Sequence, residues 1–83
     1  MAWFVYMLRC GDNSLYTGYT DDVQRRLATH QSGKGAKYTR GRGPLTLVYR
    51  EECGDKPAAL RRELEVKALP REGKLALIEG RFT

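Results

Sequence analysis

The segment from Trp3 to Leu8 limits the possible folds of this chain more than any other feature of the sequence. Its residues, WFVYML, are apolar or aromatic at every position, so both faces of an extended strand built from them would be hydrophobic. Such a strand must be covered on both sides, which predicts a central strand with other elements packed above and below it. The chain has 83 residues. That length supports one small core, so we expect a single domain over residues 1–83.

The residues that follow predict a β-hairpin. Gly11-Asp12-Asn13-Ser14 is a turn-forming sequence, and the residues after it return to strand composition. In a three-residue loop, Asn13 would take the left-handed conformation that it tolerates, and Tyr6 would pair with Gly18. Tyr6 and Tyr16 would then share one face, with space left beside them by Gly18. A loop of two or four residues would put the two tyrosines on opposite faces.

The rest of the chain predicts helices around one more strand. Capping residues, apolar periodicity and the positions of Gly and Pro mark the boundaries of these elements. We expect a helix from Val23 to about Ser32, a flexible basic loop over residues 33–44, a strand over 45–49, a helix from Gly54 or Asp55 to about Leu69, and a short helix over 71–79.

The charge of the chain is positive and unevenly distributed. Fifteen Lys and Arg residues against ten Asp and Glu give a formal net charge of +5, which favours a polyanionic partner such as nucleic acid. No acidic residue occurs between Val23 and Arg50. The loop inside that window interleaves basic groups with an aromatic ring, a combination that suits a nucleic-acid backbone and its bases. The predicted nucleic-acid-binding residues are Lys34, Lys37, Tyr38, Arg40 and Arg42.

The apolar segments and the cysteines indicate where the protein acts. The longest apolar run, residues 2–8, is far shorter than the roughly 20 residues of a membrane span, and no basic segment precedes it. Cys10 and Cys53 are far apart, without a CxxC or Cys/His cluster. We therefore expect a cytoplasmic protein with reduced thiols and no membrane partner.

The second long helix places a carboxylate among apolar residues. At 100° per residue its apolar side chains form one broad arc, and Glu63 and Lys67 project from inside that arc, stacked four residues apart. Removing a carboxylate from water requires a compensating cation. Either Lys67 supplies it through a salt bridge, which helix geometry alone favours, or a bound metal does. The residues of the predicted apolar arc are Ala59, Leu60, Leu64, Val66 and Ala68.

Two residues of the first helix form a candidate anion site. Arg26 and His30 lie four residues apart, hence on one side of that helix. Arginine is a bidentate clamp for phosphate, and histidine donates hydrogen bonds or transfers protons near neutral pH. A solvated basic helix face is the alternative interpretation.

Together these segments resemble the GIY-YIG nuclease domain, and in particular its small stand-alone bacterial subgroup, the UPF0213-like proteins. Phe4-Val5-Tyr6 stands where the family has its GIY triplet, and Tyr16-Thr17-Gly18 where it has YIG. The Arg26 to His30 segment, the basic loop and the segment ending at Glu63 follow in the order of the family. The resemblance runs from about Phe4 to Leu77.

The resemblance implies an α/β (α+β) fold with a three-stranded antiparallel β-sheet flanked by α-helices. It also implies phosphodiester hydrolysis with one divalent metal, Mg²⁺ or Mn²⁺, bound by Glu63. We therefore expect a structure-selective DNA endonuclease of DNA repair or processing, with DNA as a more favoured partner than RNA. The implied catalytic residues are Tyr6, Tyr16, Arg26, His30 and Glu63.

The chain departs from the pattern of the family at two places. Phe4, Val5 and Thr17 replace a Gly and two Ile at packing positions. The family often has an Asn near the end of the domain that supports the active site, whereas the single Asn of this chain is Asn13, in the predicted turn. The alternative function is therefore a catalytically weak or inactive nucleic-acid-binding module with the same fold. A protein-interaction domain is the third candidate, and the oligomeric state stays open.

Overall fold

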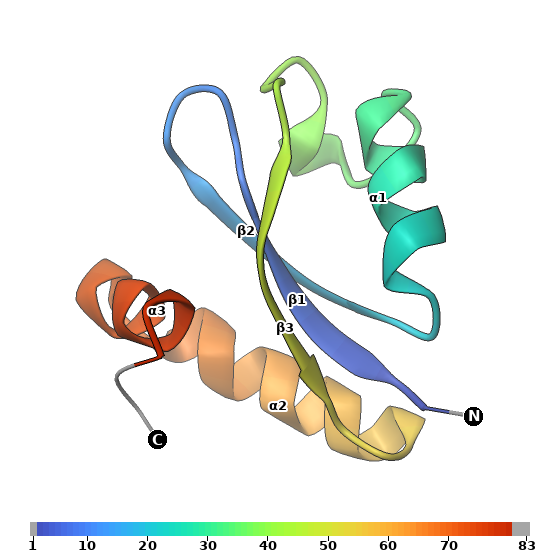
Figure 1. The fold of residues 1–83 in the computed structure, drawn as a ribbon, viewed down its shortest axis with the longest axis vertical. Helices are drawn as coiled ribbons and strands as arrows, with labels where there is room; N and C mark the ends of the chain where they lie inside the picture. Colours follow the sequence, from blue (N-terminus) through green and yellow to red (C-terminus); the bar gives the residue numbers. More distant parts are fainter. Residues whose placement is uncertain (1, 81–83) are drawn as a thin grey trace.

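The computed structural model describes residues 2–80. The fold contains three strands, three α-helices and one short 3-10 helix (Figure 1). In order they are β1 (Phe4–Arg9), β2 (Leu15–Thr20), α1 (Val23–Gln31), the 3-10 helix η1 (Lys37–Thr39), β3 (Thr46–Glu52), α2 (Lys56–Ala68) and α3 (Arg71–Ile78).

The strands form one antiparallel sheet in the order β2-β1-β3, which makes β1 the central strand, as its composition predicts. Successive side chains of β1 enter two different cores. Val5 and Met7 pack with residues of α2, whereas Tyr6 and Leu8 pack on the other face with Leu27 of α1. In Figure 1 the helix α1 lies on one side of the sheet and α2 with α3 on the other. The predicted α+β fold is confirmed.

Of the loop lengths that the sequence leaves open, the hairpin has the three-residue loop. The Cys10 amide donates to the Ser14 carbonyl at 2.9 Å, and Asn13 has a φ of 68°, in the left-handed region. Tyr6 consequently lies opposite Gly18 in the ladder. This register puts Tyr6 and Tyr16 on the face that packs against α1.

The predicted apolar arc of α2 is buried at only two of its five positions. Leu60 and Leu64 are 37% and 66% exposed, and Ala68 is exposed as well, whereas Ala59 and Val66 are fully buried. The helix turns its small Ala59 toward the sheet, and the adjacent buried position on that face is taken by Glu63. The orientation of this helix is set by its docking on the sheet rather than by its most apolar side.

The loop over residues 33–44 is more ordered than predicted. Residues 37–39 form η1, and the Gly11 amide of the hairpin turn donates to the Arg42 carbonyl. Arg42 also forms an ion pair with Asp12 of that turn. The loop is thus attached to the hairpin. The third strand also continues beyond its predicted end, to Glu52.

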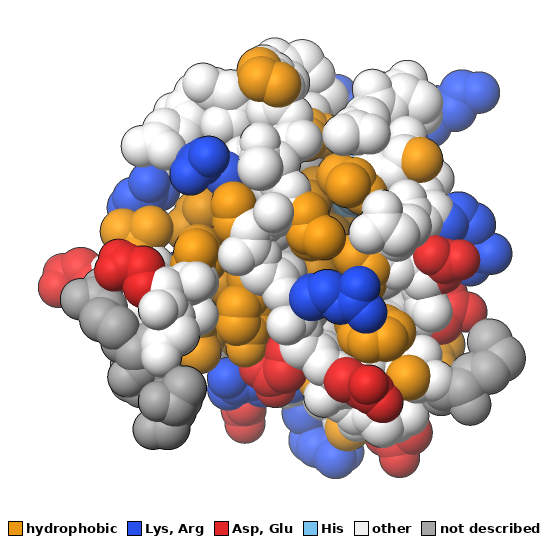
Figure 2. All heavy atoms as spheres, in the orientation of Figure 1, with side chains coloured by type: hydrophobic (Ala, Val, Ile, Leu, Met, Phe, Trp, Pro, Cys, Tyr) orange, Lys and Arg blue, Asp and Glu red, His pale blue; other side chains and the backbone are white. Residues whose placement is uncertain are grey.

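The surface separates apolar from charged side chains. Figure 2 shows hydrophobic side chains in the middle of the visible face and most charged side chains around its rim. No helix within residues 2–80 is long and apolar enough to span a bilayer. Cys10 and Cys53 are free thiols.

Candidate active site

Two tyrosines of the hairpin lie side by side because a glycine leaves room for them. The rings of Tyr6 and Tyr16 are 6.3 Å apart, and Tyr6 is only 1% exposed. A Cβ atom at Gly18 would lie 2.6 Å from the Tyr6 hydroxyl and 3.1 Å from Cε2 of Tyr16. The absence of a side chain at this position is therefore a condition for the observed arrangement of the two phenols.

The helix α1 brings a guanidinium and an imidazole to the same face. Asp22 caps this helix by accepting from the Arg25 amide at 3.0 Å, which fixes where the helical register begins. Two turns further on, the imidazole of His30 is buried, with Nε2 2.8 Å from the Tyr6 hydroxyl. The half-buried Arg26, one turn before His30, lines a pocket with Tyr6.

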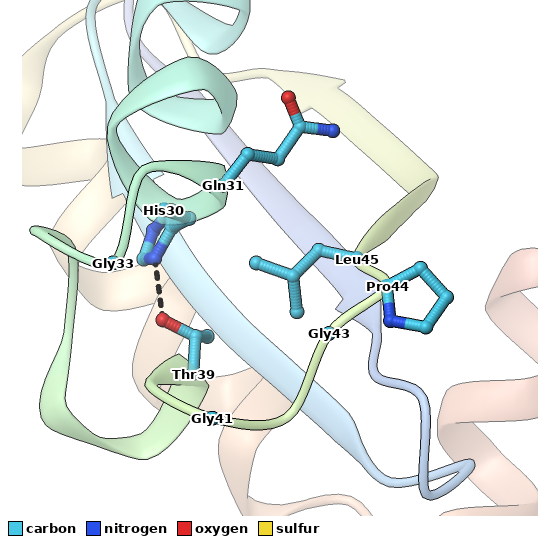
Figure 3. Close-up of a pocket in the computed structure, with 8 residues that line it drawn as sticks. All are labelled: His30, Gln31, Gly33, Thr39, Gly41, Gly43, Pro44 and Leu45. Carbon is cyan, nitrogen blue, oxygen red and sulfur yellow. Dashed lines mark hydrogen bonds between the residues drawn. The ribbon is translucent and has the colours of Figure 1, made fainter.

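The hydrogen bonds of Thr39 fix the tautomer of His30. Thr39 is 2% exposed, and its hydroxyl donates to the Ala36 carbonyl at 2.9 Å. Having given its proton to Ala36, it must accept from His30, whose Nδ1 lies 2.9 Å away (Figure 3). Nδ1 therefore carries the proton, and Nε2 accepts from the Tyr6 hydroxyl. The result is a directed chain of hydrogen bonds from Tyr6 through His30 and Thr39 to the loop backbone.

The pKa values of Tyr6 and His30 agree with this direction. Burial, with a further contribution from Tyr16, raises the pKa of Tyr6 to about 12, although Arg26 acts in the opposite sense. Burial and the positive charge of Arg26 lower the pKa of His30. Near neutral pH the phenol consequently keeps its proton and the imidazole is neutral.

The loop reaches His30 because position 35 is a glycine. A Cβ at Gly35 would lie 2.3 Å from Nδ1 of His30 and 2.8 Å from its Cα. Even the smallest side chain would push this part of the loop away from the helix. Gly35 and Thr39 are therefore the two loop residues that hold His30 in place.

Glu63 reaches the site from the opposite layer. The helix α2 packs against β1 and against the edge strand β2. From there Glu63 lines the same pocket as Tyr6 and Arg26. This pocket has a volume of about 370 Å³. Its lining residues are Trp3, Tyr6, Tyr16, Tyr19, Thr20, Arg26, Lys56 and Glu63.

Four of the five predicted catalytic residues therefore border one pocket. The fifth, His30, stands behind the phenols, hydrogen-bonded to Tyr6 and with its ring edge-on to Tyr16 at 5.1 Å. Both ring nitrogens of His30 are engaged and its side chain is buried, so its contact with the lining of the pocket is the hydrogen bond to Tyr6 and the ring contact with Tyr16. In contrast, the hydroxyl of the half-buried Tyr16 makes no hydrogen bond within residues 2–80.

Among the described residues, Glu63 forms one ion pair. Its side chain is 11% exposed, and Nζ of Lys67 lies 3.6 Å from Oε2, beyond ordinary hydrogen-bond length. Both interpretations of this carboxylate thus have support, because the salt bridge exists but leaves the carboxylate without a close donor among the described residues. Lys67 itself is half-exposed.

A magnesium-like ion fits this donor set. Among residues 2–80 no group of three or more His, Cys, Asp or Glu side chains is placed to hold a metal. Mg²⁺, however, is often held by one or two carboxylates, with water and substrate phosphates as its other ligands. Glu63, a poorly compensated carboxylate that lines an open pocket, is suited to that mode of binding.

The predicted nucleic-acid-binding residues divide into two groups. Lys34, Lys37 and Arg40 are exposed along the loop. Tyr38 and Arg42 are stacked, with the guanidinium 4.4 Å from the ring centroid, and the Tyr38 ring lies 6.0 Å from that of Tyr16. The loop thereby comes within contact of the pocket through Tyr38.

The fold and the arrangement of the site are those of one protein family. The model of the GIY-YIG catalytic domain matches residues 2–75. The chain belongs to the GIY-YIG family, a family of nucleases that generally use a divalent metal ion.

Similar proteins of comparable length come from several bacteria. The UPF0213 protein SH2523 of Staphylococcus haemolyticus is 55% identical over 78 residues, covering 94% of this chain and 95% of the relative. The UPF0213 protein YhbQ of Escherichia coli is 54% identical over 76 residues, covering 92% and 76%. The solution NMR structure of the UPF0213 protein BH0048 of Bacillus halodurans is 54% identical, with a TM-score of 0.61 over 95% of this chain and 84% of that structure.

The sequence analysis missed Thr39, Gly35 and Lys56. Thr39 and Gly35 act through contacts between the loop and α1, and no local pattern reveals such contacts. Lys56 lines the same pocket as Glu63 and lies two turns before it on α2. Helical spacing from Glu63 would therefore have indicated Lys56.

Proposed function

We propose that this protein is a metal-dependent, structure-selective DNA endonuclease that hydrolyses phosphodiester bonds in DNA repair or processing. The observation that carries the proposal is the meeting, in one open pocket, of two phenols from the hairpin, a guanidinium from α1 and a carboxylate from α2. These groups match the needs of phosphodiester hydrolysis, which requires an oriented water, neutralised phosphate charge and a stabilised leaving oxygen.

Each residue has a separate role in this reaction. Tyr16, whose hydroxyl is free of protein partners within the described residues, orients the attacking water by accepting a hydrogen bond from it. Tyr6 keeps its own proton in the bond to His30, so its oxygen is available as an acceptor and its ring holds Tyr16 in place. His30 and Thr39 are positioning residues for Tyr6.

The charged residues act on the phosphate. Arg26 stabilises the negative charge that develops on the phosphoryl oxygens. Glu63 holds Mg²⁺ or Mn²⁺, and such an ion when bound supplies Lewis-acid stabilisation of the phosphate and the leaving oxygen. Lys56 adds positive charge to the rim of the same pocket.

The loop contributes binding that does not depend on the base sequence. Lys34, Lys37 and Arg40 contact phosphates, with Tyr38 and Arg42 beside them. Phosphate contacts fix position but do not read sequence, so affinity depends steeply on salt and selection follows the shape of the DNA, such as branches, flaps or single-stranded ends. We place this activity in the cytoplasm and favour DNA over RNA.

A nicking assay tests the proposal. Branched and linear DNA are incubated with the wild type, Glu63→Ala and the matched control Glu65→Ala, in Mn²⁺, Mg²⁺ or EDTA. Glu65 is exposed on the same helix and lines none of the pockets described here. We expect metal-dependent nicking by the wild type and by Glu65→Ala, and none by Glu63→Ala.

DNA binding measured in EDTA accompanies the assay. Without metal both variants should bind DNA at least as tightly as the wild type, because each removes a negative charge that repels a polyanion. Binding without nicking in any metal would reject catalysis and support the alternative of a binding module. The absence of salt-sensitive binding by the wild type would reject both functions.

A further inference from the structure

A second groove adjoins the catalytic pocket on the outer edge of β2. It has a volume of about 320 Å³, in the range of sites for single small ligands. Tyr16 lines both cavities, so the groove and the catalytic pocket meet at this residue. Its lining residues are Leu15, Tyr16, Thr17, Tyr38, Lys67 and Lys74.

The lining of the groove contains two kinds of recognition group. One kind is aromatic, the rings of Tyr16 and Tyr38, the latter 42% exposed. The other is basic, Lys67 from α2 and Lys74 from α3. Thr17, also in the lining, has the one buried side-chain polar atom within residues 2–80 that has no hydrogen-bond partner.

From these groups we infer that the groove binds one unpaired nucleotide of a single strand, next to the phosphate that is cleaved. The inference rests on the proposed function and names the substrate class more narrowly. Aromatic faces attract the faces of bases, and in a duplex those faces are covered by neighbouring base pairs. A duplex would contact the lysines through its phosphates and would leave the tyrosine rings without a base to stack on. The exposed ring of Tyr38, next to Tyr16 and beside lysines, therefore favours a base that has left its stack, with its phosphate toward the ammonium groups.

The lysines of α2 extend this path along the sheet edge. Lys56 lines the catalytic pocket and Lys67 the groove, which places the two about 16 Å apart along the helix axis at 1.5 Å per residue. Glu63 stands between them in the sequence of the helix. A strand that follows this edge would meet positive charge before and after the catalytic carboxylate. The loop lies across the groove at Tyr38, so the strand is approached from both layers of the molecule.

Fluorescence anisotropy in EDTA tests this inference. The probes are a labelled single strand of about 12 nucleotides, within the range of known single-strand site sizes, and the duplex of the same sequence. Tyr38→Ala should weaken single-strand binding about 5- to 150-fold, as loss of a base–aromatic stack does, and duplex binding much less. Tyr38→Phe, which keeps the ring, should bind like the wild type. Because Tyr38 is largely on the surface, the alanine variant is expected to fold.

Charge variants test the lysines of the groove. Lys74→Ala should reduce the slope of log affinity against log salt by about 0.7 for the single strand. Arg61→Ala, the matched control, removes one positive charge from an exposed position of α2 outside the groove and should leave the preference for single strand over duplex unchanged. Amide chemical shifts on adding the single strand should change at residues 15–17 and near Lys67 and Lys74.

The results separate this inference from the proposed function. If Tyr38→Ala binds the single strand like the wild type, or loses single strand and duplex equally, the nucleotide groove is refuted even when metal-dependent nicking persists. Shift changes confined to residues 33–44 would refute it as well. If the wild type shows neither binding nor nicking of any DNA, the proposed function fails, and this inference fails with it.

Discussion

Replacing Thr39 by valine tests the chain of hydrogen bonds behind the catalytic pocket. Valine has nearly the shape of threonine but has no hydroxyl, so the change removes two bonds and leaves the packing. The Nδ1–H of His30 loses its acceptor, and the Ala36 carbonyl loses one of two donors, because it also accepts from the Thr39 amide at 3.0 Å. Only the imidazole is left with an unpaired buried group.

The expected loss of stability follows from these two bonds. An unpaired buried donor costs about 1–3 kcal/mol, and an ordinary hydrogen bond contributes about 0.5–1.5 kcal/mol. We expect Thr39→Val to lower the free energy of unfolding by about 2–4 kcal/mol, out of about 4–12 kcal/mol for a chain of this size. The melting temperature should fall by roughly 10–25 °C. Thr39→Ser keeps the hydroxyl and should lose about 1 kcal/mol, for the missing methyl group.

Thermal unfolding and imidazole NMR measure this prediction. His30 is the only histidine of the chain, so a ¹⁵N spectrum of the ring reports on it alone. The wild type and Thr39→Ser should show the Nδ1–H tautomer, and Thr39→Val should shift toward Nε2–H, with a lower cleavage rate because Tyr6 is no longer held as a donor. Equal melting temperatures for the valine and serine variants, or an Nε2–H tautomer in the wild type, would refute the direction of the hydrogen bonds from Tyr6 through His30 to Thr39.

Three further predictions concern the same pocket. Gly18→Ala should cost about 1–3 kcal/mol of stability through the clash with Tyr6, whereas Gly43→Ala, whose Cβ meets nothing within 4 Å, should cost much less; calorimetry compares them. Arg26→Ala should lower the single-turnover rate about 10²- to 10³-fold with a smaller change in DNA affinity, and a rate equal to wild type would remove Arg26 from the mechanism. The pKa of His30 is lowered in the folded state, so its contribution to stability is fully present above its ordinary pKa of 6.5 and is lost as the pH falls from there through the lowered value. Urea unfolding at several pH values measures this loss, and the His30→Gln variant should not show it.

The position of the two phenols could be reduced to two alternatives from the sequence, because it depends only on the length of one turn. One turn residue, Asn13, adopts the left-handed backbone that a three-residue loop needs, and this fixes the pairing of Tyr6 with Gly18. The alternation of side chains then decides which tyrosines share a face. No contact between distant parts of the chain was needed to reach this result.

The environment of α2 could not be predicted in the same way. Its most apolar side, with Leu60 and Leu64, faces solvent, and a helical wheel cannot show this because the orientation depends on how the helix docks on the sheet. The sequence does indicate that Glu63 is a carboxylate near the core. Its place in the pocket with Tyr6, however, results from the way α2 packs along the edge strand β2.

Thr39 illustrates a second limit of sequence reasoning. The loop over residues 33–44 has the composition of a flexible segment, with glycines and basic residues. Its order comes from the approach of Gly35 to His30, the bonds of Thr39 and the ion pair of Arg42 with Asp12. Each of these contacts joins the loop to another element, α1 or the hairpin turn, and no sequence motif marks the residues that meet.

The attachment of the loop also has a thermodynamic consequence. A free arm loses conformational entropy when it closes on a polyanion, and that loss subtracts from affinity. Here the segment between His30 and the hairpin turn has already lost much of that freedom during folding, through Thr39 at one point and Arg42 at another. Its positive charges are therefore already held in place before DNA binds. The loss of conformational entropy on binding should be small relative to the number of phosphates that the loop neutralises.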